Sequence, residues 1–404
     1  MRIIVQKFGG TSVSTPERRS LVADRVERAV KDGFATVVVV SAMGRQGDPY
    51  ATDTLIQLAN AACPELAPRE MDLLLSCGEL LSSVIMAGTL KARGLPATVL
   101  TGGQAGIFTD DNFGNAHILR VDPAAMLKRL REDQVVVVAG FQGRTEQGEV
   151  TTLGRGGSDT TAAAVGGALK AEVVEIYTDV DGVKTADPRL VPEARTLTVT
   201  TYDEIAQMAH YGAKVVHPRA VEIAMQRRVP LRIKSTFADG PGTLITYSVE
   251  AAGAHWSELH SDKPVTGVTH VGGLAQVSLQ VGDDLLDLFR TLAGAGISVD
   301  LINVSPGAAS FCIDELKLER AQALLRGLGL APATTPGCAK VSVVGSGMRG
   351  RPGVMAKVVE ALAGAGVPIL QTADSHVTIS CLVEAAQLKG AVQALHTVFG
   401  LADA

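Results

Sequence analysis

The sequence lacks any long hydrophobic run. Its longest apolar runs, Thr36–Met43 and Val135–Gly140, are strand-sized and far shorter than the roughly 18 residues that a membrane-spanning helix needs. The first residues, Met1–Lys7, place only three apolar side chains before polar ones return, which is too few for the core of a signal peptide. We therefore expect a cytoplasmic protein that has no membrane-spanning segment and no membrane partner.

Cysteine is scarce, and blocks of positive charge are absent. The five cysteines (Cys63, Cys77, Cys312, Cys338 and Cys381) are odd in number and show no Cys-x-x-Cys spacing, so we interpret them as buried thiols rather than metal ligands or a redox pair. The 37 Lys and Arg residues stand against 42 Asp and Glu residues, with a net charge of -5. Without a basic stretch to track phosphates, nucleic acid is not an expected partner.

What the sequence contains is typical of a folded protein with more than one domain. Its 404 residues correspond to two or three domains at roughly 150 residues each. The first 248 residues alternate short β-branched runs with longer amphipathic stretches, which predicts an α/β fold with a mostly parallel sheet between helices. The expected strands are Ile3–Gln6, Thr36–Ser41, Ala97–Thr101, Val135–Ala139, Val173–Thr178 and Leu231–Lys234, and the expected helices are Pro16–Lys31, Arg69–Arg93, Pro123–Arg131, Asp159–Leu169 and His217–Arg228. Ligands of such sheets gather at the carboxyl ends of the strands.

The C-terminal part contains an internal repeat. Leu292–Ile297 recurs as Leu362–Val367, 70 residues later. Each copy reads as strand, helix, strand, strand, helix, which is typical of a βαββαβ unit whose fourth strand the second copy lacks. We expect residues 264–270 to supply that strand. The predicted division is therefore 1–248, a linker at 249–263, a first repeat unit at 271–336, and a second unit formed by 264–270 plus 337–404, into which the first is inserted.

Three polar motifs stand out, and the first two directly follow expected strands. In Lys7–Ser12 two glycines let backbone N–H groups approach an anion beside a lysine, which suits a polyphosphate but also a plain tight turn. Ser41–Gly44 forms a second turn of this kind. Thr151–Thr161 combines three glycines, a guanidinium and an Asp flanked by hydroxyls at an expected helix start. These are more polar groups than a structural loop needs, so we predict an anionic substrate there, with Arg155 able to hold a carboxylate.

Other candidate residues are ambiguous from their pattern alone. Tyr177–Arg189 is either an Asp-rich surface turn or the border of a nucleotide site. Glu79, inside a largely apolar helix, is either a solvated residue or a ligand for a cationic group. Lys214, His217 and Arg219 stand in one short motif and permit capping, surface or binding roles.

Taken together, these motifs resemble those of aspartate kinases, which are members of the amino acid kinase family. The matching segments are Val5–Ser12, Val40–Gly44, Val138–Gly143, Thr152–Thr161, Tyr177–Gly182 and Gly212–Pro218. The repeat is similar to the two ACT domains that follow the catalytic domain in this family, so the resemblance covers essentially the whole chain. Arg45–Asp53 and Ala373–Thr378 are similar to the diaminopimelate-sensitive form.

The resemblance implies an amino acid kinase fold followed by two ferredoxin-like βαββαβ ACT domains. It also implies ATP-dependent phosphorylation of the β-carboxylate of L-aspartate to 4-phospho-L-aspartate, which leads to lysine, threonine, methionine and diaminopimelate. A carboxylate with a pKa of about 3.9 is already ionised at neutral pH, so positioning and charge neutralisation should carry the catalysis. Mg²⁺ would bridge the phosphates of ATP, because no cluster of protein ligands is visible that could hold it alone.

The resemblance also implies roles for individual residues. Lys7 would neutralise charge on the transferring phosphoryl group, and Asp159 would organise Lys7 and the substrate. Arg155 would hold the α-carboxylate of aspartate, and Glu79 would pair with its α-amino group. The other substrate-binding residues would be Thr52, Gly156, Gly157 and Ser158, and ATP would contact Lys7, Phe8, Gly9, Gly10, Ser41, Thr178, Asp179, Lys184, Asp187, Arg189 and Lys214. Lys184 departs from the family pattern, because many relatives carry an aromatic residue there.

The ACT-like repeat implies regulation. Such modules bind a pathway amino acid between two copies, often across a dimer interface, so we expect a homodimer and feedback by lysine, threonine or meso-diaminopimelate. Candidate contacts are Asp283, Asn303 and Ser305 in the first copy and Met348, Asp374 and Ser375 in the second. Turns and strand ends would explain the same residues.

Two other functions remain open at this point. A kinase of N-acetylglutamate or glutamate could use the same fold, but an acylated amino group needs no partner such as Glu79. An amino-acid sensor built on an inactive kinase would have no use for Lys7, Arg155 and Asp159 together.

Overall fold

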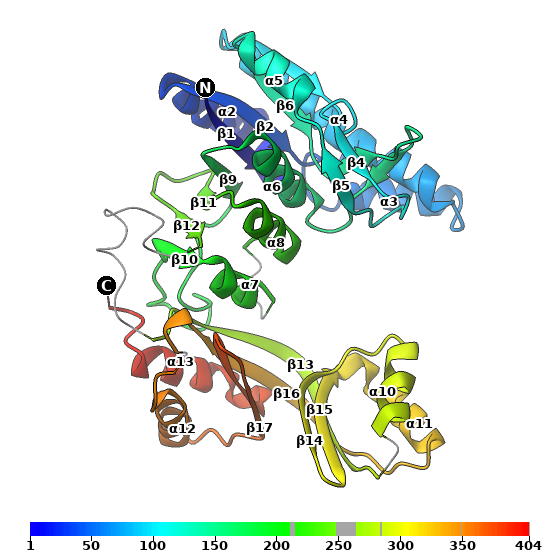
Figure 1. Cartoon of the computed structure of the whole chain (residues 1–404), viewed down its shortest axis with the longest axis vertical. Helices are drawn as coiled ribbons and strands as arrows, with labels where there is room; N and C mark the ends of the chain where they lie inside the picture. The colour runs from blue at the N-terminus through cyan, green and yellow to red at the C-terminus, as the bar shows by residue number, and fades with distance from the viewer. Residues whose placement is uncertain (211–214, 248–263, 283–284, 349, 404) are drawn as a thin grey trace. The chain divides into compact units, whose positions relative to one another are not determined.

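The computed structural model describes residues 1–210, 215–247, 264–282, 285–348 and 350–403. The chain forms two compact units (Figure 1). The N-terminal unit comprises residues 1–183, 196–209 and 214–260, and the C-terminal unit comprises residues 184–195, 210–213 and 261–404. Each unit has its own sheet and its own hydrophobic core.

An eight-stranded sheet organises the N-terminal unit, with the strand order β10-β12-β11-β9-β1-β2-β6-β3. Its strands are β1 (Arg2–Phe8), β2 (Phe34–Val40), β3 (Ala97–Leu100), β6 (Val135–Ala139), β9 (Val173–Thr178), β10 (Val199–Thr201), β11 (Leu231–Ser235) and β12 (Thr243–Thr246). All neighbours pair in parallel except β11 and β12. The predicted α/β fold with a mostly parallel sheet is confirmed.

Helices cover both faces of this sheet. On one face α2 (Pro16–Lys31) and α4 (Pro68–Ala92) bury apolar side chains against Phe8, Val38 and Val137. On the other face α6 (Gly157–Leu169) packs on β1 and β9 and contacts α8 (Pro218–Arg227). The other helices in the described part of the unit are α1 (Gly10–Val13), α3 (Thr52–Ala62), α5 (Ala124–Arg131) and α7 (Tyr202–His210).

The helix α4 is long and apolar enough to cross a membrane, judged by length and composition alone. Half of its most apolar stretch is buried inside the protein. It packs against β2, β3 and β6 and carries two buried carboxyl groups, those of Asp72 and Glu79. These contacts are those of a core helix.

A second, four-stranded sheet lies beside the main one, in the order β5-β4-β7-β8. Its strands are β4 (Ile107–Thr109), β5 (Ile118–Val121), β7 (Gln142–Arg144) and β8 (Val150–Thr152). A hydrogen bond of 2.6 Å between the hydroxyls of Thr109 and Thr151 joins its two halves. Because β7 follows β6 closely and β8 leads into α6, this sheet carries the Thr151–Thr161 motif to the edge of the main sheet.

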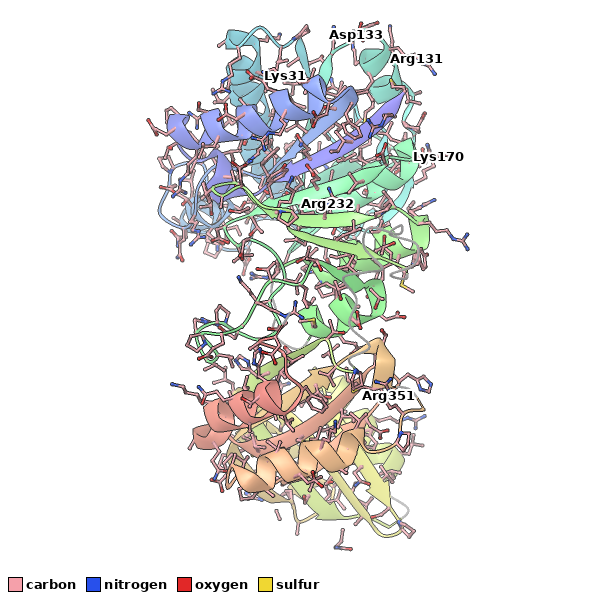
Figure 2. The ribbon with its side chains drawn as sticks, turned by 90° about the vertical axis from the view of Figure 1, so that its left-hand side faces the viewer. Lys31, Arg131, Asp133, Lys170, Arg232 and Arg351 are labelled. Carbon is pink, nitrogen blue, oxygen red and sulfur yellow. The ribbon has the colours of Figure 1, made fainter. Side chains whose placement is uncertain are left out.

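The helices α2, α5 and α6 end at one edge of the unit. Their last or capping residues, Lys31, Arg131 and Lys170, lie in the upper part of Figure 2. Each of these helices is followed directly by a strand of the main sheet. The carboxyl ends of the parallel strands therefore lie at the opposite edge, where ligands of such sheets bind.

The C-terminal unit contains one six-stranded sheet, in the order β14-β15-β13-β16-β18-β17. Its strands are β13 (Gly267–Gln280), β14 (Asp300–Ser305), β15 (Ala308–Asp314), β16 (Ala333–Val344), β17 (Gln371–Asp374) and β18 (Thr378–Glu384). Its helices are α10 (Leu285–Gly294), α11 (Leu318–Gly327), α12 (Val354–Gly364) and α13 (Leu388–Val398). Separate cores lie under α10 and α11 and under α12 and α13, as two repeat copies require.

The strands β13 and β16 are each shared by the two repeat copies. Gly267–Val271 pairs with Lys340–Val344, which pairs in turn with β18, whereas the later part of β13 pairs with β15. We expected two separate strands here, one from residues 264–270 for the second unit and one within the first unit, which was to begin at residue 271. The structure instead keeps β13 continuous through register shifts at Val271, Leu274 and Gln276; such bulges bend a strand without ending it. The domain boundaries themselves stay a prediction.

The segment Lys184–Arg195 belongs to the C-terminal unit, although we expected it within residues 1–248. Ala186, Val191 and Ala194 are buried in the core that lies under α12 and α13. The N–H of Val268 donates to the carbonyl of Thr185 at 2.7 Å. The chain thus leaves the N-terminal unit after Val183 and returns to it at Thr196.

Candidate active site

A cavity of about 690 Å³ lies at the carboxyl ends of β1 and β2. Nine of the predicted site residues line it, namely Lys7, Ser41, Thr52, Glu79, Arg155, Gly156, Gly157, Ser158 and Asp159. They come from the end of β1, the turn after β2, the helices α3 and α4, and the loop that opens α6. The fold therefore gathers into one place residues that are up to 152 positions apart in the sequence.

Lys7 and Asp159 form an ion pair inside this cavity. The Lys7 Nζ lies 2.6 Å from the Asp159 Oδ1, and each side chain is 13% exposed. Asp159 stands in the first turn of α6, where backbone N–H groups without helical partners favour negative charge. The pair places one positive charge at the end of β1, held in position by a carboxylate.

Two turns meet closely beside Lys7, and glycine allows them to. A Cβ added to Gly10 would stand 2.5 Å from the Ala42 carbonyl oxygen and 2.7 Å from the Gly44 carbonyl oxygen. The Gly44 N–H donates to the Gly10 carbonyl at 3.1 Å. The turn after β1 and the turn after β2 are thus bonded backbone to backbone, and only glycine at position 10 fits between them.

Glu79 is a buried carboxyl group with one oxygen engaged. Its side chain is 2% exposed, and its Oε1 accepts the N–H of Ala42 at 3.0 Å. Its Oε2 has no hydrogen-bond partner among the described residues. Burial raises the pKa of this carboxyl to about 8. The side chain can therefore accept a cationic group, which would compensate the charge that burial disfavours.

The glycine-rich loop before α6 has a backbone that glycine makes possible. Gly154 and Gly156 have φ values of 72° and 71°, in the left-handed region. A Cβ on Gly156 would stand 2.2 Å from the His217 ring. Between these glycines Arg155 is exposed, and no hydrogen bond to another described residue occupies its guanidinium. This arrangement leaves Arg155 available to an anionic ligand.

Other predicted nucleotide contacts lie outside the cavity lining. The Phe8 ring is fully buried and stacks on Tyr177 at 4.7 Å, so only its backbone could meet a ligand. The Asp179 carboxylate accepts Arg45 at 2.9 Å, and Arg45 also donates to the Thr11 hydroxyl at 3.0 Å. These contacts hold the turn after β9 beside the turn after β1.

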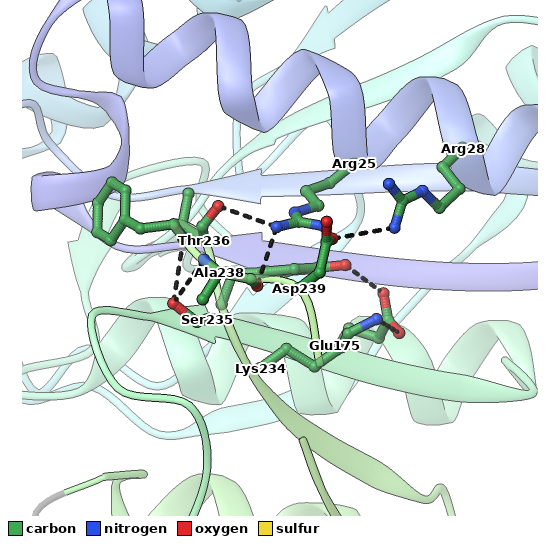
Figure 3. Close-up of polar contacts among 10 residues, drawn as sticks. Arg25, Arg28, Glu175, Lys234, Ser235, Thr236, Ala238 and Asp239 are labelled. Carbon is green, nitrogen blue, oxygen red and sulfur yellow. Dashed lines mark hydrogen bonds and ion pairs between the residues drawn. The ribbon is translucent and has the colours of Figure 1, made fainter. Parts of the chain in front are cut away.

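The segment after β11 closes the same edge of the sheet. The Thr236 N–H donates to the Thr178 carbonyl at 3.0 Å, and its hydroxyl bonds the Ser12 hydroxyl at 2.7 Å. Arg25 of α2 anchors this segment by donating to the Ala238 carbonyl at 3.0 Å and to the Asp239 carboxylate (Figure 3). The predicted residue Thr178 is thereby fixed at a crowded polar turn.

The remaining nucleotide candidates lie outside the N-terminal unit or outside the described residues. Lys184, Asp187 and Arg189 belong to the C-terminal unit. There the Arg189 guanidinium, 2.6 Å from the Asp187 carboxylate, lowers the pKa of that carboxyl. Lys214 lies outside the described residues. Their contact with a nucleotide stays a prediction.

Twelve further residues line the cavity without having been named individually as site residues, although Thr152 and Gly154 belong to the predicted Thr151–Thr161 motif. The additional lining residues are Asp53, Ile56, Leu66, Pro68, Met71, Asp72, Leu75, Phe113, Gly114, Phe141, Thr152 and Gly154. Several of them lie on or just after α3, a helix that the sequence pattern did not reveal. Asp72 could have been found, because it precedes Glu79 by seven residues and two helical turns place both carboxyls on one face.

The predicted effector contacts are spread over the C-terminal unit. Asn303 and Ser305 are exposed on β14 and line a second cavity of about 390 Å³. Met348 is buried in the core under α12 and α13. Asp374 and Ser375 are exposed at the end of β17, where the Ser375 hydroxyl bonds that of Thr378 at 2.8 Å. Asp283 lies outside the described residues.

Comparison with known proteins identifies the family. A model of the amino acid kinase family matches residues 2–235, and an ACT domain model matches residues 333–397. Aspartokinase 1 of Bacillus subtilis is 49% identical over 99% of this chain and 100% of its own length. The chain belongs to the aspartokinases of the amino acid kinase family. The predicted resemblance is confirmed over the full length.

Solved structures of this family agree with the fold. Escherichia coli aspartokinase III in complex with aspartate and ADP aligns with a TM-score of 0.75 at 27% identity, covering 98% of this chain and 99% of that one. The same enzyme in complex with lysine and aspartate aligns with a TM-score of 0.76 at 27% identity over the same shares. As a family member the chain is a kinase that uses ATP, and its ACT domains are consistent with allosteric control.

Proposed function

We propose that the cavity of about 690 Å³ is the place where aspartate receives the γ-phosphoryl group of ATP, giving 4-phospho-L-aspartate. One observation carries this proposal: two cations and one buried carboxyl group line the same cavity. Arg155 suits the substrate's carboxylate, Lys7 suits the phosphoryl group, and Glu79 suits the substrate's ammonium. A ligand with one ammonium and two carboxylates matches these three groups.

The residues divide the work according to charge. Arg155 holds the α-carboxylate, and Glu79 receives the α-ammonium on its Oε2, which has no protein partner in the described part of the chain. The β-carboxylate is then directed to the Lys7 ammonium, where the negative charge of the phosphoryl group must be neutralised. Thr52 and Ser158 complete the polar shell. No general base is required, because the attacking carboxylate is already ionised.

Mg²⁺ fits this site as an ion held by the phosphates of ATP. Among the described residues no group of three metal-ligating side chains occurs, and Mg²⁺ commonly keeps several waters and binds through substrate phosphates with one or two carboxylates. Of the four acidic residues that line the cavity, Asp53 and Asp159 could contribute, because Asp72 binds backbone N–H groups and Glu79 is assigned to the substrate's ammonium. When bound, the ion would neutralise charge on the phosphates.

The substrate assignment is tested by trapping the acyl phosphate with hydroxylamine. With ATP and Mg²⁺, the wild-type protein should form hydroxamate from L-aspartate and not from glutamate or N-acetylglutamate. Absence of product from all three acids would contradict the proposal and favour an amino-acid sensor. The Lys7→Ala variant should lower turnover at least tenfold with the fold intact, because the cation that meets the phosphoryl group is lost. Lys31→Ala, which removes an exposed lysine from the end of α2, is the matched control and should keep wild-type turnover.

Regulation is proposed at the C-terminal unit. The supporting observations are the second cavity, which holds Asn303 and Ser305, and the lysine complex of the E. coli relative. We expect the protein to be a soluble cytoplasmic homodimer joined through its ACT domains. We expect one end product, lysine, threonine or meso-diaminopimelate, to inhibit it. Adding each amino acid to the hydroxamate assay identifies the effector, and inhibition by meso-diaminopimelate would place the chain in the diaminopimelate-sensitive subtype.

A further inference from the structure

Asp72 is a buried carboxylate that binds backbone rather than another side-chain charge. It is fully buried in α4, and each of its two oxygens lies 3.0 Å from the N–H of Gly114. Its Oδ2 also accepts the N–H of Thr152 at 2.7 Å, and its Oδ1 accepts the Thr152 hydroxyl at 2.6 Å. A buried carboxylate with this many donors is firmly held, because every donor would be left without a partner if it moved.

Arg219 binds the complementary groups of the same two segments. Its Nη1 donates to the Leu153 carbonyl at 2.9 Å, and its Nη2 donates to the Ala116 carbonyl at 2.6 Å. The Ala116 N–H in turn donates to the Thr152 carbonyl at 2.9 Å. Two adjoining backbone stretches, around Gly114–Ala116 and Thr152–Leu153, are therefore held from both sides. Asp72 of α4 accepts hydrogen bonds from their N–H groups, and Arg219 of α8 donates hydrogen bonds to their carbonyl groups. One of these stretches runs directly into Gly154 and Arg155.

We propose that Asp72 is a positioning residue that sets the separation between Arg155 and Glu79, and with it the affinity for the amino-acid end of the substrate. Glu79 stands two turns further along the same helix, so a bond from Asp72 to Thr152 fixes the origin of the Arg155 loop relative to Glu79. The inference rests on the proposed function, since it assumes that Arg155 and Glu79 bind the two α-substituents of aspartate. Asp72 itself touches no reacting atom.

The test compares Asp72→Asn with a matched buried carboxylate elsewhere. Asn keeps the shape but presents an amide NH₂ to backbone N–H donors. We expect its aspartate KM to rise at least fivefold while its ATP KM stays within twofold of wild type. Glu204 is the control, because it is fully buried and accepts the Thr201 N–H at 2.9 Å and the Thr200 hydroxyl at 3.0 Å outside the cavity. Glu204→Gln should lower the melting temperature without changing either KM.

A double-mutant cycle separates positioning from general loss of stability. If Asp72 acts through Arg155, the aspartate KM of Asp72→Asn with Arg155→Ala should rise by less than the product of the two single effects. Thr152→Val, which removes only the 2.6 Å bond, should raise the aspartate KM at least twofold and keeps the test available if Asp72→Asn does not fold.

Three results would overturn the inference. They are an aspartate KM of Asp72→Asn that rises less than fivefold, an ATP KM that rises equally, and strict multiplicativity in the cycle. Wild-type protein that makes no aspartyl hydroxamate overturns the proposed function as well, whereas an active wild type with unaltered variants overturns the positioning role alone.

Discussion

The carboxyl group of Glu79 determines how aspartate binding depends on pH. Burial raises its pKa to about 8, so below that pH the carboxyl of the free protein is mostly protonated and cannot pair with the substrate's ammonium. We expect the aspartate KM to fall as pH rises from 6 to 8, and aspartate binding at pH 7 to release protons. Calorimetry in buffers of different ionisation enthalpy measures that release. Glu79→Gln should have a higher KM that is flat over this range; a wild-type KM independent of pH would contradict the assignment.

Raising the pH strengthens aspartate binding through Glu79, but it weakens the contribution of the same residue to stability. Its pKa in the folded protein, about 8, lies above the ordinary value of 4.5, so between these pH values the folded chain binds more protons than the unfolded one. This carboxyl therefore lowers the free energy of unfolding as pH rises from about 4.5 to about 8. Substrate binding requires Glu79 to be ionised, whereas folding favours its neutral form. The substrate's ammonium offsets this difference, because it stabilises the ionised carboxylate in the folded protein.

At the level of elements, the close approach of the turns after β1 and β2 depends on Gly10. In Gly10→Ala the new Cβ would meet two carbonyl oxygens at 2.5 and 2.7 Å, so the turns must separate. We expect a loss of about 1–3 kcal/mol in the free energy of unfolding, and at least tenfold lower turnover because Lys7 lies beside this contact. Gly88→Ala is the control: nothing stands within 4 Å of its Cβ in α4, so it should gain about 0.5–1 kcal/mol. Chemical denaturation and the hydroxamate assay compare the two, and a neutral Gly10→Ala would show that the turns separate freely.

The elements that the sequence predicted well are those with a strong local pattern. Runs such as Val37–Val40 and Val135–Val138 are continuous β-branched strands buried on both faces of a parallel sheet, and α2 carries a Thr15 cap, Pro16 at its start and an apolar face. The strands of the second sheet have only three or four residues, too few to show a period. The continuity of β13 was missed because Gly272 and Gly273 usually mark a turn, whereas here they form a bulge.

The residues of the candidate site likewise fall into those that the sequence pattern predicted and those that it did not. Lys7, Arg155 and Asp159 were found because polar groups stand out directly after strands or at a helix start. Asp72 was missed because its seven-residue spacing to Glu79 was not used, and because its backbone N–H partners at Gly114 and Thr152 cannot be read from the sequence. The excursion of Lys184–Arg195 into the other unit was missed for a related reason, since its buried Ala186 and Val191 resemble ordinary loop residues.

At the scale of the whole molecule, that excursion changes what a truncation should do. Deleting residues 264–404 should abolish feedback inhibition, because the effector modules are lost. The deletion would also expose the apolar side chains of Ala186, Val191 and Ala194, so the segment that contains them should lose its fixed position. This segment also carries the predicted ATP contacts Lys184, Asp187 and Arg189. We therefore expect the ATP KM to rise more than the aspartate KM. Full-length Asn303→Ala is the comparison, since it should weaken inhibition and leave the ATP KM unchanged. Truncated protein that is still inhibited would refute the assignment of regulation to this unit.

The two strands shared by the repeat copies also bear on how the chain is made. Gly267–Val271 leaves the ribosome about 70 residues before its partner Lys340–Val344, and ribosomes add roughly 5–20 residues per second. For several seconds the nascent chain therefore contains the whole first copy, while Gly267–Val271, the half of β13 that pairs with the second copy, still awaits its partner strand. A translation pause or a chain break between residues 272 and 340 should leave this half of β13 without its partner. A gene split before residue 264 should therefore be tolerated better than one between the two copies.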